Sequence, residues 1–367
     1  MSASEGVSGA ASAGGILTIG VEAIVANWRS LAARAAPARS AAVVKADAYG
    51  LGAVPLVGPL YDAGCRDFFV VTLSEAGVLR PLLPTDATIY VLNGLLPGTA
   101  AAYGDGILPV LNSLPQCRAW AEANRGARPS VIQVDTGMSR LGLDVAEQQA
   151  LANEPGLLAA TGGRLVMSHL ACADEPDKPA SGEQLAAFRA ARSRLPGLAG
   201  SLAASSGIFL GPDYHFDLTR PGAALYGIET SPLATGIRPV VDLRIRVAQL
   251  REIEAGTSVG YGYTFRASRT IRLATLATGY ADGWWRRFSG GAVAAYHGDT
   301  RLPSVGRVSM DSFSVDISAL PVGALAEGDL LELIGPHQSA DDLARAAGTI
   351  GYEVLTSLGH RYHRVYS

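Results

Sequence analysis

Short apolar runs alternate with longer amphipathic stretches through the first two thirds of the chain. Eight of these runs have the length and composition of β-strands. They are "AAVVKA" (41–46), "DFFVVT" (67–72), "ATIYVLN" (87–93), "ILPVLN" (107–112), "SVIQVD" (130–135), "RLVMSHL" (164–170), "SLAASS" (201–206) and "FDLTRPG" (216–222). Strands that alternate with helices predict parallel βα units, and eight such strands close a (β/α)8 TIM barrel.

The pattern changes after about residue 236. Stretches such as "VVDLRIRVAQLREI" and "ASRTIRLATLAT" alternate apolar and polar residues in period two, with Gly, Pro and Asp turns between them. This pattern predicts an antiparallel β domain, closed by short helices in "SADDLARAAG" and near "GYEVLTSLG". We therefore expect a flexible tail at 1–14, an α/β barrel at 15–236 and a mainly antiparallel β C-terminal domain at 237–367.

Composition excludes several classes of protein. The chain has 367 residues and a formal net charge of −3, with Lys and Arg spread along it, so no nucleic-acid partner is expected. Its three cysteines lack C-x-x-C spacing, which argues against a disulfide framework and a zinc site. No apolar run is long enough to span a bilayer, and the N-terminus lacks a secretory signal. We expect a cytoplasmic protein with no membrane partner and no metal.

Polar residues fall at the carboxyl ends of five predicted strands, where barrel enzymes place their chemistry. These residues are Lys45, Arg140, His169, Ser206 and Arg220. A lone lysine at a strand end more often extends along the rim into water than acts in catalysis. Because five strand ends converge, we favour catalysis for Lys45.

A lysine in this position can have a lowered pKa and form a Schiff base. The strand 8 segment "RPGAALYG" offers the amides of Gly222 and Ala223 to an anion, and Ser206 adds a hydroxyl. A lysine, a phosphate site and an arginine suggest pyridoxal 5'-phosphate. A metal-free aldolase combines a lysine with a phosphate site too, so spacing alone leaves both readings open.

Seven segments in order resemble the alanine racemase family. They are "VVKADAYGLG", "VDTGMSRLG", "SHLACADEPD", "RPGAALYG", "VGYGYTF", "GYADGWWRR" and "GRVSMD". The resemblance runs from about residue 16 onward. It implies a barrel with a C-terminal β domain, pyridoxal phosphate as cofactor, and a homodimer whose active sites are completed by the partner subunit.

The resemblance also implies residue roles. Lys45 matches the lysine that holds the cofactor and serves as one catalytic base, and Tyr261 matches the opposite base, which comes from the other subunit. Removing the α-proton from one face and returning one on the other requires two bases on opposite sides.

Further roles follow from the same resemblance. Arg220 matches the arginine that faces the pyridine nitrogen, His169 its histidine partner, and Arg140 the arginine that contacts the cofactor phenolic oxygen and the substrate carboxylate. The remaining matches are to phosphate contacts and to residues near the substrate. The phosphate contacts are Tyr49, Ser206, Gly222 and Ala223, and the substrate residues are Met310 and Tyr280.

Three positions depart from the family pattern. Gln133 stands where many members carry a carbamylated lysine that supports the strand 5 arginine, and a neutral amide can hydrogen-bond Arg140 instead. Ser205 replaces an asparagine. His360 aligns with a C-terminal phosphate-binding tyrosine, for which Tyr362 is the other candidate.

The sequence favours a racemase that interconverts L- and D-alanine and supplies D-alanine for peptidoglycan. The close alternative is an amino-acid racemase of wider range, for example one that accepts serine. A non-catalytic cofactor-binding barrel is disfavoured by "VGYGYTF" and "GRVSMD" beyond the barrel. A decarboxylase is disfavoured by Arg220, since decarboxylases usually place a carboxylate at the pyridine nitrogen.

Overall fold

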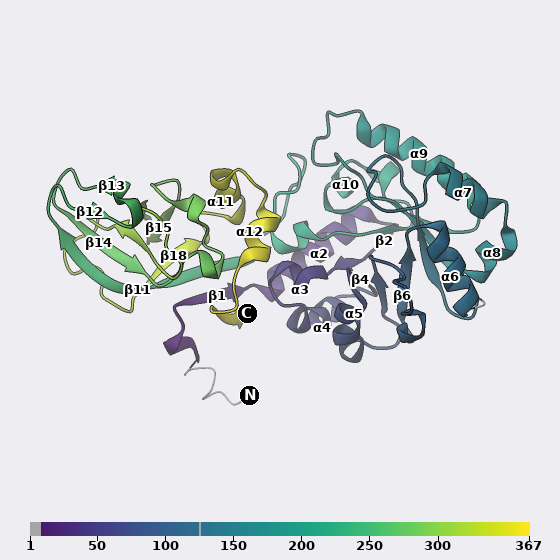
Figure 1. The fold of residues 1–367 in the computed structure, drawn as a ribbon, viewed down its shortest axis with the longest axis horizontal. Coiled ribbons are helices and arrows are strands. Elements are labelled where there is room, and N and C mark those ends of the chain that lie inside the picture. The colour runs from purple at the N-terminus through teal and green to yellow at the C-terminus, as the bar shows by residue number, and fades with distance from the viewer. Residues whose placement is uncertain (1–8, 125) are drawn as a thin grey trace. The chain divides into compact units, whose positions relative to one another are not determined.

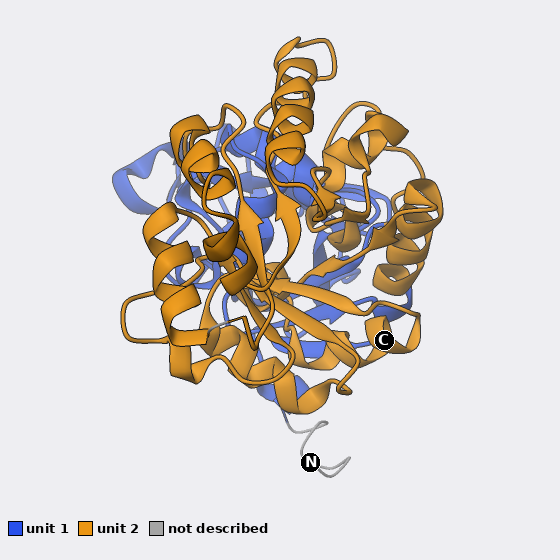
Figure 2. Ribbon diagram, turned by 90° about the vertical axis from the view of Figure 1, so that its right-hand side faces the viewer, with its two compact units in different colours: residues 1–22, 239–367 blue, residues 23–238 orange. Residues whose placement is uncertain are grey.

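The computed structural model describes residues 9–124 and 126–367 (Figure 1). The chain forms two compact units, coloured separately in Figure 2. Residues 23–238 form what we call the barrel unit, and residues up to 22 together with 239–367 form the β unit. The predicted tail lies outside the described residues as far as residue 8. The predicted boundaries after residues 14 and 236 stay predictions.

The barrel unit alternates strands and helices along its whole length. Its strands are β2 (Arg39–Ser40), β3 (Ala42–Val43), β4 (Asp67–Val70), β5 (Thr88–Val91), β6 (Ile107–Leu111), β7 (Ser130–Gln133), β8 (Gly163–Met167), β9 (Ala199–Ser201) and β10 (Leu218–Thr219). Its α-helices are α2 (Val21–Ala35, which begins in the β unit), α3 (Lys45–Tyr49), α4 (Val54–Asp62), α5 (Leu73–Leu79), α6 (Leu114–Asn124), α7 (Val145–Ala152), α8 (Pro155–Ala160), α9 (Ala180–Arg194) and α10 (Ser205–Phe209). Short 3-10 turns are η1 (Arg80–Leu82), η2 (Ala100–Ala102), η3 (Pro212–Tyr214) and η4 (Ala223–Tyr226).

Strands β3 to β9 form a parallel sheet in sequence order, which β10 closes. On one side of β10 the Arg220 amide donates to the carbonyl oxygen of Ala203 at 2.9 Å. On the other side the Ala41 amide donates to Thr219 and the Val43 amide to Pro221, each at 2.9 Å. Figure 2 shows the strands inside a ring of helices. The predicted barrel is therefore confirmed.

Burial explains why the barrel strands read as continuous apolar runs. All five residues of β6 and all four of β4 and β7 are buried, as parallel strands covered on both faces require. In β4, the ring of Phe69 stacks on Tyr90 of β5 with 4.4 Å between ring centroids. This packing fixes the strand ends from which the site is built.

The first predicted strand is shorter than the apolar run 41–46. β3 ends at Val43, and the Val44 amide still donates to the carbonyl oxygen of Phe69 at 2.9 Å. Beyond it, Ala46 has a φ of 51°, which ends extended pairing. Lys45 therefore begins the turn α3 instead of closing the strand.

The β unit is built on an antiparallel sheet, which confirms the predicted β domain. Its order is β14-β17-β16-β15-β18-β11-β1-β19, where β1 pairs antiparallel with β11 and parallel with β19. The strands are β1 (Gly15–Ile19), β11 (Val241–Ile253), β12 (Ser258–Val259), β13 (Phe265–Arg266), β14 (Ile271–Leu276), β15 (Ala294–His297), β16 (Thr300–Val305), β17 (Phe313–Asp316), β18 (Leu330–Ile334) and β19 (His363–Tyr366). The turns and helices are η5 (Tyr261–Tyr263), η6 (Tyr280–Asp282), η7 (Arg286–Phe288), α11 (Ala340–Ala347) and α12 (Gly351–Ser357).

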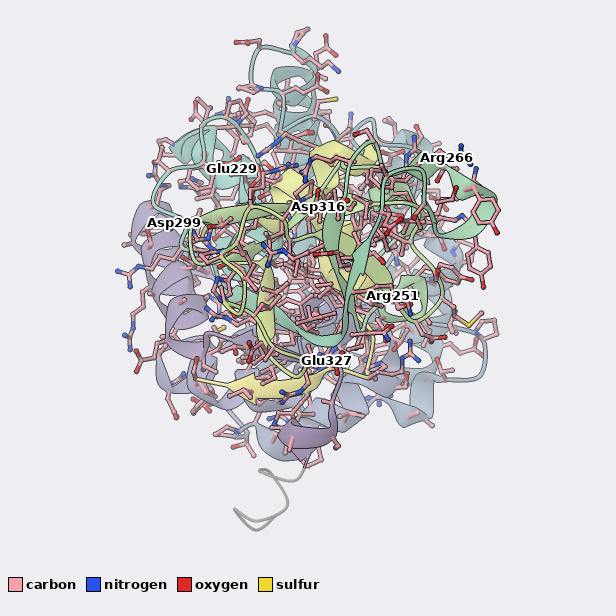
Figure 3. All side chains as sticks on the ribbon, turned by 90° about the vertical axis from the view of Figure 1, so that its left-hand side faces the viewer. Glu229, Arg251, Arg266, Asp299, Asp316 and Glu327 are labelled. Atoms are coloured by element: carbon pink, nitrogen blue, oxygen red, sulfur yellow. The ribbon has the colours of Figure 1, made fainter. Side chains whose placement is uncertain are left out.

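Both predicted C-terminal helices are present. Ser339 caps α11 through a capping box with Asp342, and Gly348 ends it with a φ of 71°. Charged side chains of both signs are exposed on the β unit, among them Arg251, Arg266, Asp299 and Glu327 (Figure 3). Within residues 9–124 and 126–367, no helix is long and apolar enough to cross a membrane.

Candidate active site

Lys45 lies at the mouth of the barrel with its side chain partly buried. Burial lowers the pKa of its amine, and the positive charges of Arg140 and Arg220 lower it further. The negative charge of Glu75 acts in the opposite direction. The net direction is downward, which leaves more of the amine neutral and nucleophilic at neutral pH.

The turn that follows Lys45 is left-handed. Ala46, Asp47 and Ala48 have φ and ψ between 46° and 54°, a conformation that costs a non-glycine residue about 1–2 kcal/mol. Two carboxylates hold it: Glu75 Oε1 accepts from the Ala46 amide and Asp47 Oδ1 from the Ala53 amide, each at 2.7 Å. Strained backbone of this kind concentrates at functional sites.

Arg220 is buried at the end of β10, with 3% of its surface exposed. Its Nη2 donates to the carbonyl oxygens of Ser168 at 2.6 Å and Leu202 at 3.4 Å, and its Nη1 donates to Ser201 Oγ. Burial lowers the pKa of Arg220 to about 10, so it remains a cation at neutral pH. The guanidinium is therefore fixed by the ends of neighbouring strands.

His169 follows β8 beside this guanidinium. Burial lowers its pKa to about 3, and the charges of Arg220, Arg140 and Lys45 add to the effect. The imidazole is therefore neutral at physiological pH. Three basic side chains around a neutral histidine give the barrel mouth a positive potential, which favours an anionic ligand.

Arg140 is exposed on the loop after β7. The Asp135 carboxylate gathers that loop by accepting from the amides of Gly137, Met138 and Ser139 at 2.9–3.1 Å. Ser139 has a φ of 56°, so the chain turns sharply immediately before Arg140. The charge of Arg140 acts on both Lys45 and His169, so this turn brings the arginine near the strand ends.

Gln133, the last residue of β7, hydrogen-bonds the same loop. Its Nε2 donates to the carbonyl oxygen of Leu141 at 3.2 Å. The main-chain carbonyl oxygen of Gln133 accepts from the Leu143 amide at 2.8 Å. The amide therefore hydrogen-bonds the backbone beside Arg140, where the sequence suggested the arginine side chain as its partner.

A buried glutamine of α9 connects the two loops. Gln184 Nε2 donates to the carbonyl oxygen of His169 at 3.0 Å and to Thr136 Oγ1 at 3.2 Å, while its Oε1 accepts from the Ala171 amide at 2.8 Å. Thr136 in turn hydrogen-bonds Ser168 Oγ at 2.8 Å. One side chain thus bonds the His169 segment and the loop that carries Arg140.

Tyr49 and Gly222 lie against each other at the far end of the mouth. A methyl group on Gly222 would overlap the Tyr49 hydroxyl and lie 3.3 Å from Val43 Cβ. Only glycine therefore permits this close approach. The Tyr49 ring also packs on Tyr226, with 4.9 Å between centroids.

Two serines lie next to this glycine. Ser205 Oγ accepts from the Gly222 amide at 2.9 Å and from the Ala224 amide at 3.2 Å. Ser206 Oγ donates to the carbonyl oxygen of Thr230 at 2.7 Å. The predicted phosphate contacts of the barrel unit thus lie on α3, α10 and η4, with Ala223 at the start of η4.

The remaining predicted residues lie in the β unit. Tyr261 is 64% exposed on η5, and Met310 is 52% and Tyr280 is 41% exposed. The Tyr280 amide donates to the carbonyl oxygen of Ser309 at 3.0 Å, which brings the Tyr280 and Met310 segments together. Exposed tyrosine and methionine side chains in adjacent segments are typical of a surface that binds a partner.

Tyr362 and His360 differ in their surroundings. Tyr362 is buried in the β unit, and its hydroxyl hydrogen-bonds Thr278 Oγ1 at 2.7 Å. Burial raises its pKa. His360 is exposed, and which of the two contacts a phosphate stays a prediction.

Sequence reasoning missed Glu75 and Gln184. The capping box of Thr72 and Glu75 marks the start of α5, but it gives no sign that Glu75 also reaches Ala46. A further signal was present in the composition, since Lys45 and Lys178 are the only lysines among 30 basic residues. A chain that otherwise uses arginine keeps a lysine at the barrel mouth.

Family models match almost the whole chain. Residues 19–230 match the alanine racemase N-terminal domain, and residues 240–366 match the alanine racemase C-terminal domain. An alanine racemase from Brucella ovis is 52% identical, covering 96% of this chain and 94% of the relative. A catabolic alanine racemase from Mesorhizobium japonicum is also 52% identical, covering 97% and 94%.

Solved structures of the same kind superimpose closely. The alanine racemase of Bartonella henselae, with covalently bound pyridoxal phosphate, has a TM-score of 0.93 at 43% identity and covers 97% of this chain and 100% of that one. The biosynthetic alanine racemase of Pseudomonas aeruginosa has a TM-score of 0.87 at 36% identity, with 97% and 99% covered.

Proposed function

The chain belongs to the alanine racemase family, and we propose that it interconverts L- and D-alanine with Lys45 and Tyr261 as its two bases. The family depends on pyridoxal phosphate and generally supplies D-alanine for peptidoglycan. The observation that carries the proposal is the placement of Lys45, a partly buried amine of lowered pKa on a strained turn among basic groups.

The residues at the barrel mouth fit pyridoxal phosphate. Lys45 would hold its aldehyde carbon covalently. At the other end, the hydroxyls of Tyr49 and Ser206 and the amides of Gly222 and Ala223 would bind the phosphate. The close approach of Gly222 to Tyr49 supports this assignment, because it brings the Tyr49 hydroxyl beside the Gly222 backbone, and a side chain at position 222 would displace that hydroxyl. When bound, the cofactor would acidify the α-hydrogen of an attached amino acid by delocalising negative charge.

Arg220 and His169 would set the strength of that delocalisation. A guanidinium only donates hydrogen bonds, so Arg220 beside the ring nitrogen would leave that nitrogen unprotonated. Neutral His169 would keep the surroundings of Arg220 from gaining a further charge. By keeping the cofactor a weaker electron sink, Arg220 would limit side reactions such as transamination.

Arg140 would bind the carboxylate of the substrate and the phenolic oxygen of the cofactor. The Met310 amide and the Tyr280 ring would complete the substrate pocket. Gln133 supports the Arg140 loop through Leu141, so we propose that this loop needs no carbamylated lysine. His360 would replace the usual C-terminal tyrosine at the phosphate.

We further propose a homodimer in which Tyr261 of the partner subunit faces Lys45. Lys45 would move the proton on one face of the α-carbon, and the tyrosine would move it on the other. The exposure of Tyr261, Tyr280 and Met310 on one unit supports an interface there. We place the protein in the cytoplasm, where the free thiols of Cys65, Cys117 and Cys172 remain reduced.

A racemase of wider range, for example one that accepts serine, is the alternative. One methylene is worth only about 1–3 kcal/mol in such a pocket, so selectivity based on pocket size is never absolute and some serine turnover is compatible with either proposal. The test is α-hydrogen exchange in heavy water with each L-amino acid. Fast exchange limited to alanine supports the proposal, whereas equal exchange of serine favours the alternative.

Tyr261→Phe tests the second base in the same assay. Exchange that starts from one alanine enantiomer should fall by about 10²–10⁴-fold, and exchange from the other should fall far less. Tyr263→Phe, a neighbouring exposed tyrosine of η5, is the matched control. Equal losses from both enantiomers would contradict the two-base scheme.

A further inference from the structure

Glu75 forms hydrogen bonds in two directions from the first turn of α5. Its Oε2 accepts from the amides of Val71 at 2.7 Å and Thr72 at 3.0 Å, which closes the end of β4. Its Oε1 accepts from the Ala46 amide at 2.7 Å. Both carboxylate oxygens of Glu75 thus accept hydrogen bonds from backbone amides, and one of these amides belongs to the residue directly after Lys45.

The hydrogen bond from the Ala46 amide to Glu75 lies at a stretch of backbone whose conformation is unfavourable. Ala46 is the first left-handed residue of α3, and the left-handed turn continues to Tyr49. A carboxylate that accepts from a backbone amide makes a stronger hydrogen bond than a neutral acceptor does. Glu75 therefore stabilises the unusual backbone that sets the direction of Lys45.

Glu75 also supplies the negative charge that acts on Lys45. The charged and titratable groups that bear on Lys45 from the other strand ends are Arg140, Arg220 and His169. Two of these are permanent cations, and His169 is neutral. Among the charged groups that shift the pKa of the Lys45 amine, Glu75 is the one that raises it, against the effect of the cations.

We propose that Glu75 is a positioning residue that sets both the direction and the charge of Lys45. This inference rests on the proposed function and deepens it. Glu75 would hold the Lys45 backbone in one orientation and would offset part of the positive charge around the amine. A removed carboxylate would release the Ala46 amide and leave Lys45 among cations alone.

The fold contains a matched control. Glu147 occupies the same capping-box position on α7 as Glu75 does on α5. Its Oε2 accepts from the Asp144 amide at 3.3 Å, and its Oε1 accepts from the Leu114 amide at 3.0 Å. Glu147 therefore joins a helix start to the preceding βα segment just as Glu75 does, but at a segment that carries no lysine.

The pH dependence of lysine acetylation measures the charge effect directly. The full chain, freed of any cofactor with hydroxylamine and dialysis, is treated with acetic anhydride across a pH series, and acetylation of Lys45 is followed by peptide mass spectrometry. Lys178, which is exposed and paired with Glu175 at 2.6 Å, is an internal reference in every sample. Only the neutral amine reacts: its nitrogen bonds to the acyl carbon, acetate leaves, and the amine proton passes to water.

Glu75→Gln should shift the midpoint for Lys45 downward by roughly one pH unit, because the remaining charges disfavour the ammonium form. Glu147→Gln should leave that midpoint unchanged, and neither substitution should move the Lys178 midpoint. A Lys45 midpoint that stays in place or rises in Glu75→Gln overturns the proposal.

Hydrogen exchange measures the positioning effect. The Ala46 amide should exchange about tenfold faster or more in Glu75→Gln and should be unaffected in Glu147→Gln. Glu75→Asp retains the charge but is one methylene shorter, so it should speed exchange at Ala46 while keeping the Lys45 midpoint nearer the wild-type value. If Glu75→Gln does not fold, unchanged exchange at Ala46 in Glu75→Asp overturns the proposal.

These readouts need neither cofactor nor substrate. Failure of the unaltered chain to bind pyridoxal phosphate or to racemise alanine would refute the proposed function and leave the Glu75 result interpretable.

Discussion

Arg220 Nη2 donates a hydrogen bond of 2.6 Å to the carbonyl oxygen of Ser168, the residue before His169. The bond joins the end of β10 to the end of β8 inside the barrel unit. It fixes a buried cation beside an imidazole whose pKa is lowered to about 3. The site therefore combines one neutral histidine, His169, with arginines that stay positively charged.

Acid should destabilise the protein through His169. Because its folded-state pKa of about 3 lies below the ordinary value of 6.5, the unfolded chain binds one more proton between these two pH values. Stability is therefore lost as the pH falls from about 6.5 towards 3. His169→Gln should reduce the loss between pH 6.5 and 4.5 by up to about 2–3 kcal/mol, measured by urea unfolding. Parallel pH profiles of the variant and the wild type would contradict a neutral His169 in the folded protein.

Gln184→Leu should impair the site beyond its effect on stability. It leaves the His169 carbonyl and the Ala171 amide without their partner, which costs about 1–3 kcal/mol per buried group. We expect racemisation to fall about tenfold or more and the pH profile of kcat/KM to change. Gln338→Leu removes a buried glutamine of the β unit that bonds the backbone of Ala294. Gln338→Leu should lower the melting temperature about as much as Gln184→Leu does, but it should leave the pH profile of kcat/KM unchanged. If both variants have the same pH profile, Gln184 has only a structural role.

Gly222→Ala should weaken cofactor binding, because the added methyl group overlaps the Tyr49 hydroxyl. We expect the Kd for pyridoxal phosphate, measured by fluorescence titration, to rise about tenfold or more. Gly182→Ala on α9 adds a methyl group in open space and is the control. Tyr49→Phe in the Gly222→Ala background should relieve the overlap and recover stability without recovering affinity. Full recovery of affinity would argue against a phosphate contact by Tyr49.

Mixed dimers test whether the site is shared. Lys45→Ala and Tyr261→Phe should each be nearly inactive. If each site combines Lys45 with Tyr261 of the partner subunit, a mixed dimer contains one intact site. Unfolding and refolding the two variants together should then restore about a quarter of wild-type activity, given random pairing. Activity that stays at the level of the separate variants would contradict the shared site.

Much of this molecule was predictable from local pattern. Eight apolar runs gave the barrel strands, and the polar residues that follow them gave Lys45, His169 and Arg220. The supports of these residues were not predictable, since Gln184 contacts His169 from a helix that begins eleven residues later in the chain, a contact no local pattern encodes.

The left-handed turn was not predictable either. Ala46 and Ala48 are residues that normally avoid positive φ, and a lone Asp47 between them is a weak signal, so the sequence does not predict the turn. Glu75 satisfies the Ala46 amide of the turn from another βα unit, a contact that depends on the finished barrel, and Asp47 joins the turn to the Ala53 amide. Strand ends can be read from a pattern, but the direction of a side chain at a strand end cannot.

The most direct test of the central claim is to locate the cofactor on the chain. Borohydride converts a lysine–cofactor C=N bond into a stable C–N bond, and peptide mass spectrometry then identifies the modified residue. Because the chain has only two lysines, the result is unambiguous. We predict the phosphopyridoxyl mass on the peptide that contains Lys45 and none on the peptide with Lys178. Labelling of Lys178, or of neither lysine, would contradict the account.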